Sequence, residues 1–367
     1  FLPQAGTVWL PDTTWLSPEL VDGAFDGARL YFPGTVTWNA DHLLVSNCTV
    51  TLADSDFHLT VTNDILIAGG GSLGIGDDPL GSNYAVNCGG RLTVTNGGSL
   101  YVYGGLTNET GPDHGTLVTV NGGGVIGRDS WVYPVAHEIN GGTALFRLGS
   151  LWIETNAGFN ASSRGYAGRT GPGKGATAGN SGGGAGHGGR GGDGAGGIPG
   201  GGVYDSTNAP FQPGSGGGTY VNADYWPRGG SGGGSIRLEI AGGLTLGGSL
   251  LANGGKSGHI QYGGGGAGGT INVRCGYIQA LTNSVLSAVG GDTTDAAHAG
   301  NSGPGGGGRI AVWNAVTESD RQRILADQAP GNALVFTNDF SFLPQLSYSV
   351  SNGAGYAAPT QAESGTA

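Results

Sequence analysis

One segment of the sequence has the spacing of a phosphate-binding loop. Gly168–Lys174 reads Gly-Arg-Thr-Gly-Pro-Gly-Lys and satisfies most of that pattern. A phosphate-binding loop needs a Ser or Thr after the lysine to hold magnesium, at the start of a helix. Gly175 stands in that place, and the glycine run after it disfavours a helix. The segment therefore does not predict a nucleotide site.

A second segment, Gly188–Asp193, resembles one nonapeptide of the calcium-binding toxin repeats. That motif needs tandem copies and a large apolar residue, whereas Ala195 occupies the apolar position. In the same region His187, Arg190 and Asp193 recur every third residue. In an extended helix with three residues per turn they would lie along one edge about 9 Å apart, too far for a catalytic triad. We expect a solvated polar edge, with calcium binding as the alternative.

Carboxylate and basic side chains could catalyse the cleavage of a polysaccharide. A lyase needs a base beside a charge neutraliser, and a hydrolase needs two carboxylates across a groove. The acidic pairs in the sequence have no basic cluster beside them; they are Asp54 with Asp56, Asp77 with Asp78, and Asp292 with Asp295. Glu239 and Arg274 are expected to face each other as a cross-strand ion pair. We assign no catalytic, cofactor-binding or metal-binding residue and expect a protein that is not an enzyme.

Three cysteines, Cys48, Cys88 and Cys275, leave at least one thiol unpaired. Their spacing fits neither a disulfide framework nor a metal motif. Cys275 falls in an inward position and is expected to be a small buried hydrophobe, while the redox states of Cys48 and Cys88 stay open. Three sequons match glycosylation acceptors, at Asn47, Asn108 and Asn160.

The composition excludes two classes of partner. The formal net charge of −11 argues against nucleic-acid binding, which needs a basic surface. No run approaches the roughly 18 apolar residues of a membrane-spanning helix. Lysine is rare, methionine is absent, and Thr, Ser, Asn and Gly are abundant, a composition that suits an exported protein. We therefore expect an extracellular or cell-surface location.

Segments of alternating apolar and polar residues recur along the chain. Those before the long glycine block lie at intervals of roughly 25–35 residues, as in solenoid coils; they are 59–67, 92–102, 117–121 and 144–153. After that block three strands align, with Ile236, Ile271 and Ile310 in one column. The next columns place Leu238, Val273 and Val312 inward, and Arg237, Asn272 and Ala311 outward. This pattern predicts an all-β, right-handed parallel β-helix.

Glycine-rich segments interrupt the coils, the longest at 165–200. Glycine buries little apolar surface and loses much backbone entropy, so the order of these segments must come from backbone hydrogen bonds. A polyproline-II-type helix has no internal hydrogen bonds and must bond its neighbours. Each excursion leaves from the same corner of a coil, which would stack them side by side. We predict a polyglycine-II bundle on one side of the solenoid, formed by residues 165–234, 254–269 and 290–308.

The expected organisation has four parts. Residues 1–58 are a cap with short strands, and 59–316 are the solenoid with its glycine bundle. Residues 317–350 contain one short helix, 317–328, followed by strands. Residues 351–367 are a linker or an assembly arm. The tetrapeptide Phe-Leu-Pro-Gln occurs at both 1–4 and 342–345, so equivalent segments could occupy related sites across a junction between copies.

The ordered set of glycine motifs over residues 90–314 resembles a module of very large secreted bacterial surface proteins. The set includes Gly165-Tyr-Ala-Gly, Gly-Gly-Gly-Ala-Gly-His-Gly-Gly-Arg-Gly-Gly and the Gly-Gly-Ser-Ile-Arg-Leu strand. The resemblance implies export and a structural or adhesive role, without catalytic residues to transfer. The glycine bundle is also similar to the polyglycine-II cores of glycine-rich antifreeze proteins and phage tip adhesins, which lack the β-solenoid expected here.

The sequence thus predicts an extracellular structural protein that assembles with itself, head to tail, into a filament or a surface element with an adhesive role. The alternative is a β-helical polysaccharide lyase or hydrolase, or a carbohydrate-binding protein. No cofactor is expected. The partners would be other copies of the chain and, in the alternative, a polysaccharide.

Overall fold

The computed structural model describes residues 6–34, 36–77, 84–106, 114–179, 181–207, 209–219, 229–257, 263–293, 302–315, 317, 319, 343–355 and 362–367. Within these ranges the chain is all-β, as expected, with one short 3-10 helix, η1 (Thr13–Trp15). The helix expected at 317–328 lies almost wholly outside the described residues.

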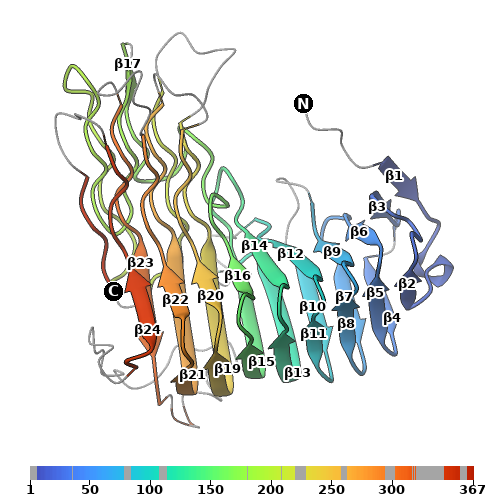
Figure 1. Cartoon of the computed structure of the whole chain (residues 1–367). Helices are drawn as coiled ribbons and strands as arrows, with labels where there is room; N and C mark the ends of the chain where they lie inside the picture. Colours follow the sequence, from blue (N-terminus) through green and yellow to red (C-terminus); the bar gives the residue numbers. More distant parts are fainter. Residues whose placement is uncertain are drawn as a thin grey trace.

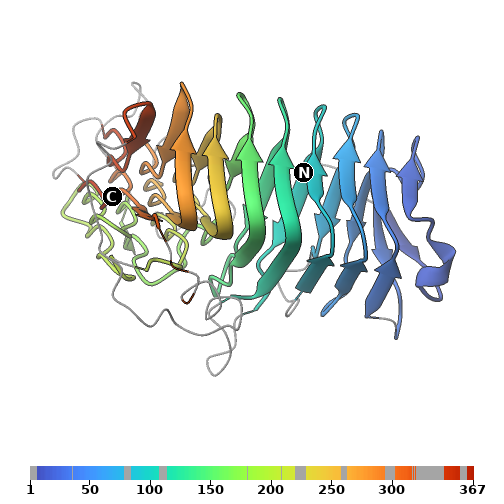
Figure 2. The same cartoon turned by 90° about the horizontal axis from the view of Figure 1, so that it is seen from below.

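Two long parallel sheets form the body of the protein, and the chain passes repeatedly from one to the other (Figures 1 and 2). The ten-stranded sheet contains, in order, β1 (Gly6–Trp9), β3 (Ala28–Tyr31), β6 (Thr49–Leu52), β9 (Ser72–Ile75), β12 (Ser99–Tyr103), β14 (Trp131–Val135), β16 (Gly158–Asn160), β20 (Ser249–Leu251), β22 (Ser284–Ser287) and β24 (Leu346–Ser349).

The twelve-stranded sheet has a continuous path of nine strands: β2 (Glu19–Val21), β5 (Leu43–Ser46), β8 (Ile65–Ala68), β11 (Leu92–Val94), β13 (Thr116–Ile126), β15 (Ala144–Ile153), β19 (Ser235–Leu246), β21 (Thr270–Ala280) and β23 (Arg309–Trp313). Three shorter strands complete it: β4 (Thr37–Ala40), β7 (His58–Val61) and β10 (Tyr84–Cys88). From β13 to β21 one long strand takes the place of two short ones, and the pairings between these long strands contain a register shift. The architecture is compatible with a parallel β-helix.

The hydrophobic core lies between the two sheets and runs along the stack. Strands show the alternating burial of a sheet with one face inward, as in β12 and β14. Ile236, Ile271 and Ile310 pair in register as expected. Leu238 and Val273 are fully buried in the next inward column.

The expected outward column is on the outer face of the sheet but is not solvated. Arg237 and Asn272 are buried because residues 209–212 cover this face. The amide of Asn272 donates to Pro210 O at 2.8 Å, and the ring of Phe211 lies 5.6 Å from the guanidinium of Arg237. The alternation of side chains along a strand predicts which face of the sheet a residue lies on. It does not predict whether another segment of the chain covers that face.

The glycine-rich segments extend away from the C-terminal half of the sheets and hydrogen-bond to one another (Figure 1). Gly217 N donates to Gly230 O at 2.9 Å, Gly230 N to Gly264 O at 2.8 Å, and Gly265 N to Gly303 O at 3.0 Å. Segments separated by long stretches of sequence thus satisfy each other's backbone groups. The two short strands β17 (Thr177–Ala178) and β18 (Ser181–Gly182) pair antiparallel within this region.

Both ends of the described chain belong to the same architecture. The strands from Gly6 to Leu52 are members of the two sheets, so residue 58 marks no change of sheet. Near the other end, Gly307 N donates to Glu363 O and Ile310 N donates to Thr366 O, both at 2.9 Å. Residues 362–367 are therefore ordered by their own chain, and their order does not require a neighbouring copy.

Candidate functional site

An aromatic patch lies on the outer face of the ten-stranded sheet. It consists of Tyr101 and Tyr103 on β12 and Trp131 and Tyr133 on β14, all half-buried on the face opposite the core. Tyr101 and Tyr133 are register partners, and their rings stack with centroids 4.5 Å apart and planes at 18°. Strict alternation in both strands produces this patch, because every second side chain of each strand points outward.

Arg164 covers part of the patch. Its guanidinium carbon lies 4.6 Å from the centroid of the Tyr133 ring, in a cation–π contact. Its main-chain carbonyl accepts a hydrogen bond from Ala136 N at 2.9 Å, which ties the residue to the end of β14. The patch is therefore a fixed surface of ring faces with a positive charge at its border.

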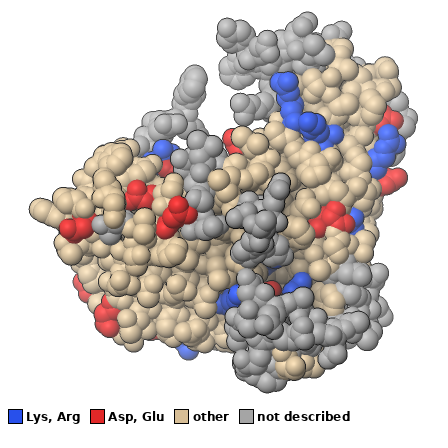
Figure 3. All heavy atoms as spheres, turned by 180° about the vertical axis from the view of Figure 1, so that it is seen from behind, with Lys and Arg blue, Asp and Glu red and all other residues tan. Residues whose placement is uncertain are grey.

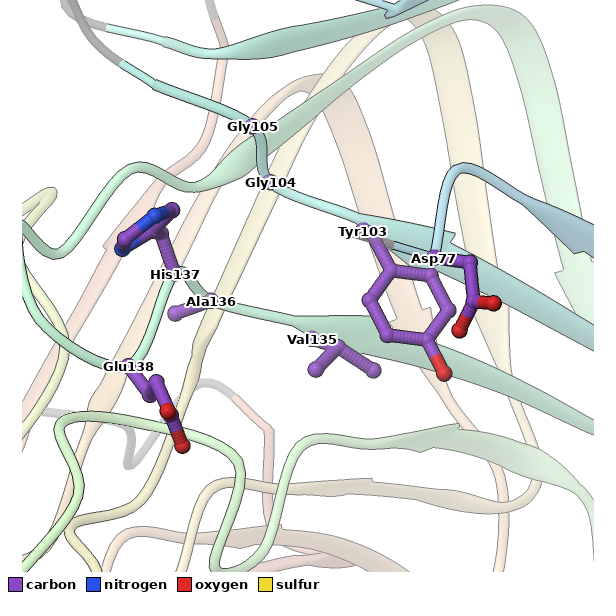
Figure 4. Close-up of a pocket in the computed structure, with 8 residues that line it drawn as sticks. All are labelled: Asp77, Tyr103, Gly104, Gly105, Val135, Ala136, His137 and Glu138. Atoms are coloured by element: carbon purple, nitrogen blue, oxygen red, sulfur yellow. The ribbon is translucent and has the colours of Figure 1, made fainter. Parts of the chain in front are cut away.

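A pocket of about 190 Å³ adjoins the patch at the carboxyl ends of β9, β12 and β14 (Figure 4). Its walls are mostly apolar, with Tyr103, Val135 and Ala136 along them and Asp77 and Glu138 at opposite ends. Gly104 also lines it, and a Cβ there would lie 2.1 Å from Gly142 O. Small-molecule pockets usually hold roughly 300–1,000 Å³, so this pocket is smaller than a typical small-molecule site.

Asp77 and Tyr103 are not poised for proton transfer. The carboxylate of Asp77 forms an ion pair with Arg29 from β3. Burial, and secondarily the negative charge of Asp77, raises the pKa of Tyr103 above its ordinary value of 10.0. Tyr103 thus keeps its proton at neutral pH and can donate a hydrogen bond, whereas a lyase base would have to lose it.

The side chain of His137 accepts backbone hydrogen bonds within a turn. Its Nδ1 accepts hydrogen bonds from Ile139 N at 3.2 Å and Asn140 N at 3.1 Å, so the ring proton is on Nε2. The buried imidazole shapes the segment that brings Glu138 to the rim of the pocket.

Two predictions from the sequence are confirmed: the ion pair between Glu239 and Arg274, and the burial of Cys275. Glu239 and Arg274 pair as expected, with 3.5 Å between Oε1 and Nη1. Arg147 adds a closer partner that the sequence analysis missed, with its Nε 2.8 Å from Glu239 Oε2. Cys275 is fully buried opposite Ile240, and burial raises the pKa of its thiol to about 12. Cys48 and Cys88 are also free and buried.

The solvated edge expected at His187, Arg190 and Asp193 is wrong at His187. His187 is fully buried, with Nδ1 2.8 Å from Gly268 O and Nε2 3.4 Å from a carboxylate oxygen of Asp205. Arg190 is exposed, and its Nη2 lies 2.8 Å from Oδ1 of Asp193. The chain bends at this point, and the even three-residue register does not hold.

The acidic pairs and the sequons that the sequence analysis named do not form a common site among the described residues. Asp54 caps the backbone of Phe32, and burial raises the pKa of its carboxyl, while Asp56 is exposed in a turn. Asp292 pairs with Lys256 at 3.5 Å. Asp78, Asp295 and the sequon residue Asn108 lie outside the described residues. Of the other two sequons, Asn47 is exposed and Asn160 is half-buried, with its side-chain oxygen bonded to Ser162 N.

The phosphate-loop segment at Gly168–Lys174 leads into the two-residue strand β17, not into a helix. Within the described ranges, no group of three or more His, Cys, Asp or Glu side chains could hold a metal ion. In the same ranges no helix is long and apolar enough to cross a membrane. Comparisons with protein-family models, curated proteins and solved structures found no match.

The sequence analysis did not single out the aromatic patch, although a signal was present. Both Leu100-Tyr-Val-Tyr103 and Trp131-Val-Tyr133 alternate aromatic residues with valine or leucine. Two successive strands that point three tyrosines and a tryptophan away from the core predict an outer aromatic surface.

Proposed function

We propose that this protein is an extracellular structural element that binds a polysaccharide on the outer face of its ten-stranded sheet. The observation that carries the proposal is the stacked pair Tyr101–Tyr133 beside a pocket in which Asp77 pairs with Arg29 and His137 accepts backbone hydrogen bonds. The C–H faces of a sugar ring can pack on the electron-rich faces of the tyrosines. Asp77 and Glu138 can accept hydrogen bonds from hydroxyl groups at either end of the pocket.

The scaffold in this proposal is a right-handed β-solenoid with a polyglycine-II bundle. Right-handedness is supported by the strong preference for right-handed crossovers between parallel strands of one sheet. The bundle is supported by the hydrogen bonds between distant glycine segments and by their close approach; a Cβ on Gly264 would lie 2.0 Å from Gly183 O. Export is supported by the composition and the resemblance to secreted surface proteins.

Binding to neutral oligosaccharides tests the proposal. Isothermal titration with cellohexaose, xylohexaose and mannohexaose should find at least one ligand. Replacing Tyr133 with Ala should weaken its binding roughly tenfold or more, about 1.4 kcal/mol, because the ring pair is lost. Tyr277→Ala is the matched control, since Tyr277 is 59% exposed on β21 of the other sheet. Equal losses in the two variants, or no binding to any of the three probes, would refute a saccharide site at the patch.

Head-to-tail assembly is a second candidate, supported by the ends of the ten-stranded sheet. Among the described strands, β1 and β24 each pair on one side only, and edge strands of this kind invite pairing with another copy. Trp9 and Trp15 are 64% and 65% exposed at the first end. The repeated Phe-Leu-Pro-Gln adds no structural support, because residues 1–4 and Phe342 lie outside the described part of the chain.

Light scattering at increasing concentration tests the assembly. Trp9→Lys places a charge on the free edge and should lower the average mass. Trp152→Lys is the control, because Trp152 is 51% exposed but lies in the middle of the other sheet. A protein that stays monomeric at high concentration would rule out assembly through this edge.

A further inference from the structure

A second groove, of about 490 Å³, lies among the glycine-rich segments. It is lined by Arg169, by the run from Lys174 to Thr177 and by the run from Pro199 to Gly202, and we call it the cationic groove. Two of its lining residues carry positive charge and none carries negative charge. Its volume falls within the range of roughly 300–1,000 Å³ that is usual for ligand sites.

Among the residues that the structure describes, the two cations of the groove have no side-chain partner. The side chains of Arg169 and Lys174 are exposed, and neither has an ion pair or a hydrogen bond with any residue the structure describes. In contrast, Lys256, the other lysine of the chain, pairs with Asp292, and Arg190 pairs with Asp193. In a protein of net charge −11, two unneutralised cations in one concavity create a local positive field that favours an anion.

The wall of the groove is rigid. A Cβ on Gly200 would lie 1.9 Å from Gly191 O, and one on Gly201 would lie 1.8 Å from Gly173 O, so packed backbone forms this side. Arg169 has a left-handed backbone with φ of +73°, and its N–H donates to Gly217 O at 2.9 Å. This conformation is strained for a residue other than glycine. The hydrogen bond holds the backbone of Arg169 in place and so sets the direction in which its side chain begins. A ligand would meet a preformed site.

We propose that the cationic groove binds the carboxylate or sulfate groups of an acidic polysaccharide. The guanidinium of Arg169 can hold two oxygens of such a group, and Lys174 can add a further charged hydrogen bond. The choice of a polysaccharide rests on the proposed function, whereas the choice of an anion rests on the groove alone. A nucleotide is disfavoured because no helix follows Lys174 to receive a phosphate.

The groove is linked to the pocket beside the aromatic patch. The carbonyl of Glu138, a pocket residue, accepts hydrogen bonds from Ala167 N at 2.9 Å and from Thr170 Oγ1 at 2.8 Å. Those two residues flank the position of Arg169 in the chain. The loop that presents the cation is therefore anchored on the segment that forms the pocket, and one polymer that carries acidic groups could use both sites.

Lysine footprinting provides a direct test, because the chain has only two lysines. The protein is acetylated with and without oligogalacturonate, heparin-derived oligosaccharide or cellohexaose, and each lysine is followed by mass spectrometry. With an acidic ligand at ten times its Kd, Lys174 should react roughly tenfold more slowly, since about nine-tenths of the sites are occupied. Lys256 is the internal control and should keep its rate. Protection by oligogalacturonate alone identifies carboxylates, and protection by the heparin fragment alone identifies sulfates.

Substitutions complete the test. Arg169→Gln and Lys174→Gln should each weaken binding of the protecting ligand roughly tenfold, and rising salt should weaken wild-type binding further. Arg91→Gln is the matched control, since Arg91 is exposed in the N-terminal half. Equal protection of both lysines, protection by cellohexaose to the same extent, or unchanged affinity of both groove variants would overturn the proposal. Binding of neutral oligosaccharides at the aromatic patch is measured separately, so either site can fail alone.

Discussion

Gly201 and Gly202 are neighbours for which the structure predicts opposite responses to alanine. A Cβ on Gly201 would lie 1.8 Å from Gly173 O and 2.8 Å from Gly186 N, whereas ordinary contact begins at 3.4 Å. The backbone would have to move by about 1.6 Å, because the nearest atoms are main chain and cannot rotate away. A Cβ on Gly202 would have nothing within 4 Å, and its φ is not in the left-handed region.

The cost of Gly201→Ala follows from the bonds at this place. The required shift strains Gly201 N to Gly184 O and Gly186 N to Gly173 O, both 2.8 Å. A buried backbone group left without a partner costs about 1–3 kcal/mol, and overpacking costs about the same. We expect Gly201→Ala to destabilise the glycine-rich region by about 2–6 kcal/mol, the sum of these two costs. Gly202→Ala should change its stability by less than about 0.5 kcal/mol, as at an open surface site.

Hydrogen exchange read out by mass spectrometry measures this difference locally, which matters because an elongated protein need not unfold in one step. Peptides from 182–202 and from the facing segment at 165–176 should lose protection in Gly201→Ala and keep it in Gly202→Ala. Calorimetry should show the same order for the first transition. If the two variants lose protection equally, or if Gly201→Ala is neutral, the close packing of these segments is wrong.

Two further predictions concern Cys275. Its thiol is fully buried, so a thiol reagent should label it only after denaturant is added; rapid labelling of the native protein would contradict its inward position. Its pKa is raised from 9.0 to about 12 by burial, so the unfolded chain loses this proton at lower pH than the folded chain and stability must fall as pH rises through this interval. We expect a loss of about 2–3 kcal/mol from about pH 9 to about pH 11 in urea titrations, which is shallower in Cys275→Ala. A slope unchanged by that substitution would remove the thiol as its cause.

The strands and their inward columns could be predicted because they depend on local alternation. A residue such as Ile271 or Cys275 must face the core once its strand is placed, and the repeat of Ile236, Ile271 and Ile310 predicts the parallel register. The need of the glycine segments for mutual hydrogen bonds could also be predicted, since a backbone without internal bonds must find partners elsewhere. Those requirements are contained in residue types and spacing.

Tertiary structure alone decided what covers each outer face and which distant groups meet. Arg237 and Asn272 point outward by alternation, yet residues 209–212 bury them. His187 belongs to an apparently even run of side chains, yet Asp205 and Gly268 enclose its ring. Sequence spacing describes neighbours along one strand, while a pocket or a buried ion pair forms where separate coils approach.

Charge is divided between sequence and fold in the same way. In Figure 3 the basic and acidic side chains are spread over a largely uncharged surface. The composition determined that this protein has few charges and a net charge of −11. Only the fold decided that Arg29 pairs with Asp77, whereas Arg169 and Lys174 share a groove that has no acid among its described lining residues. Coulomb interactions depend on distance and on burial, and neither quantity is contained in the order of residues along the chain.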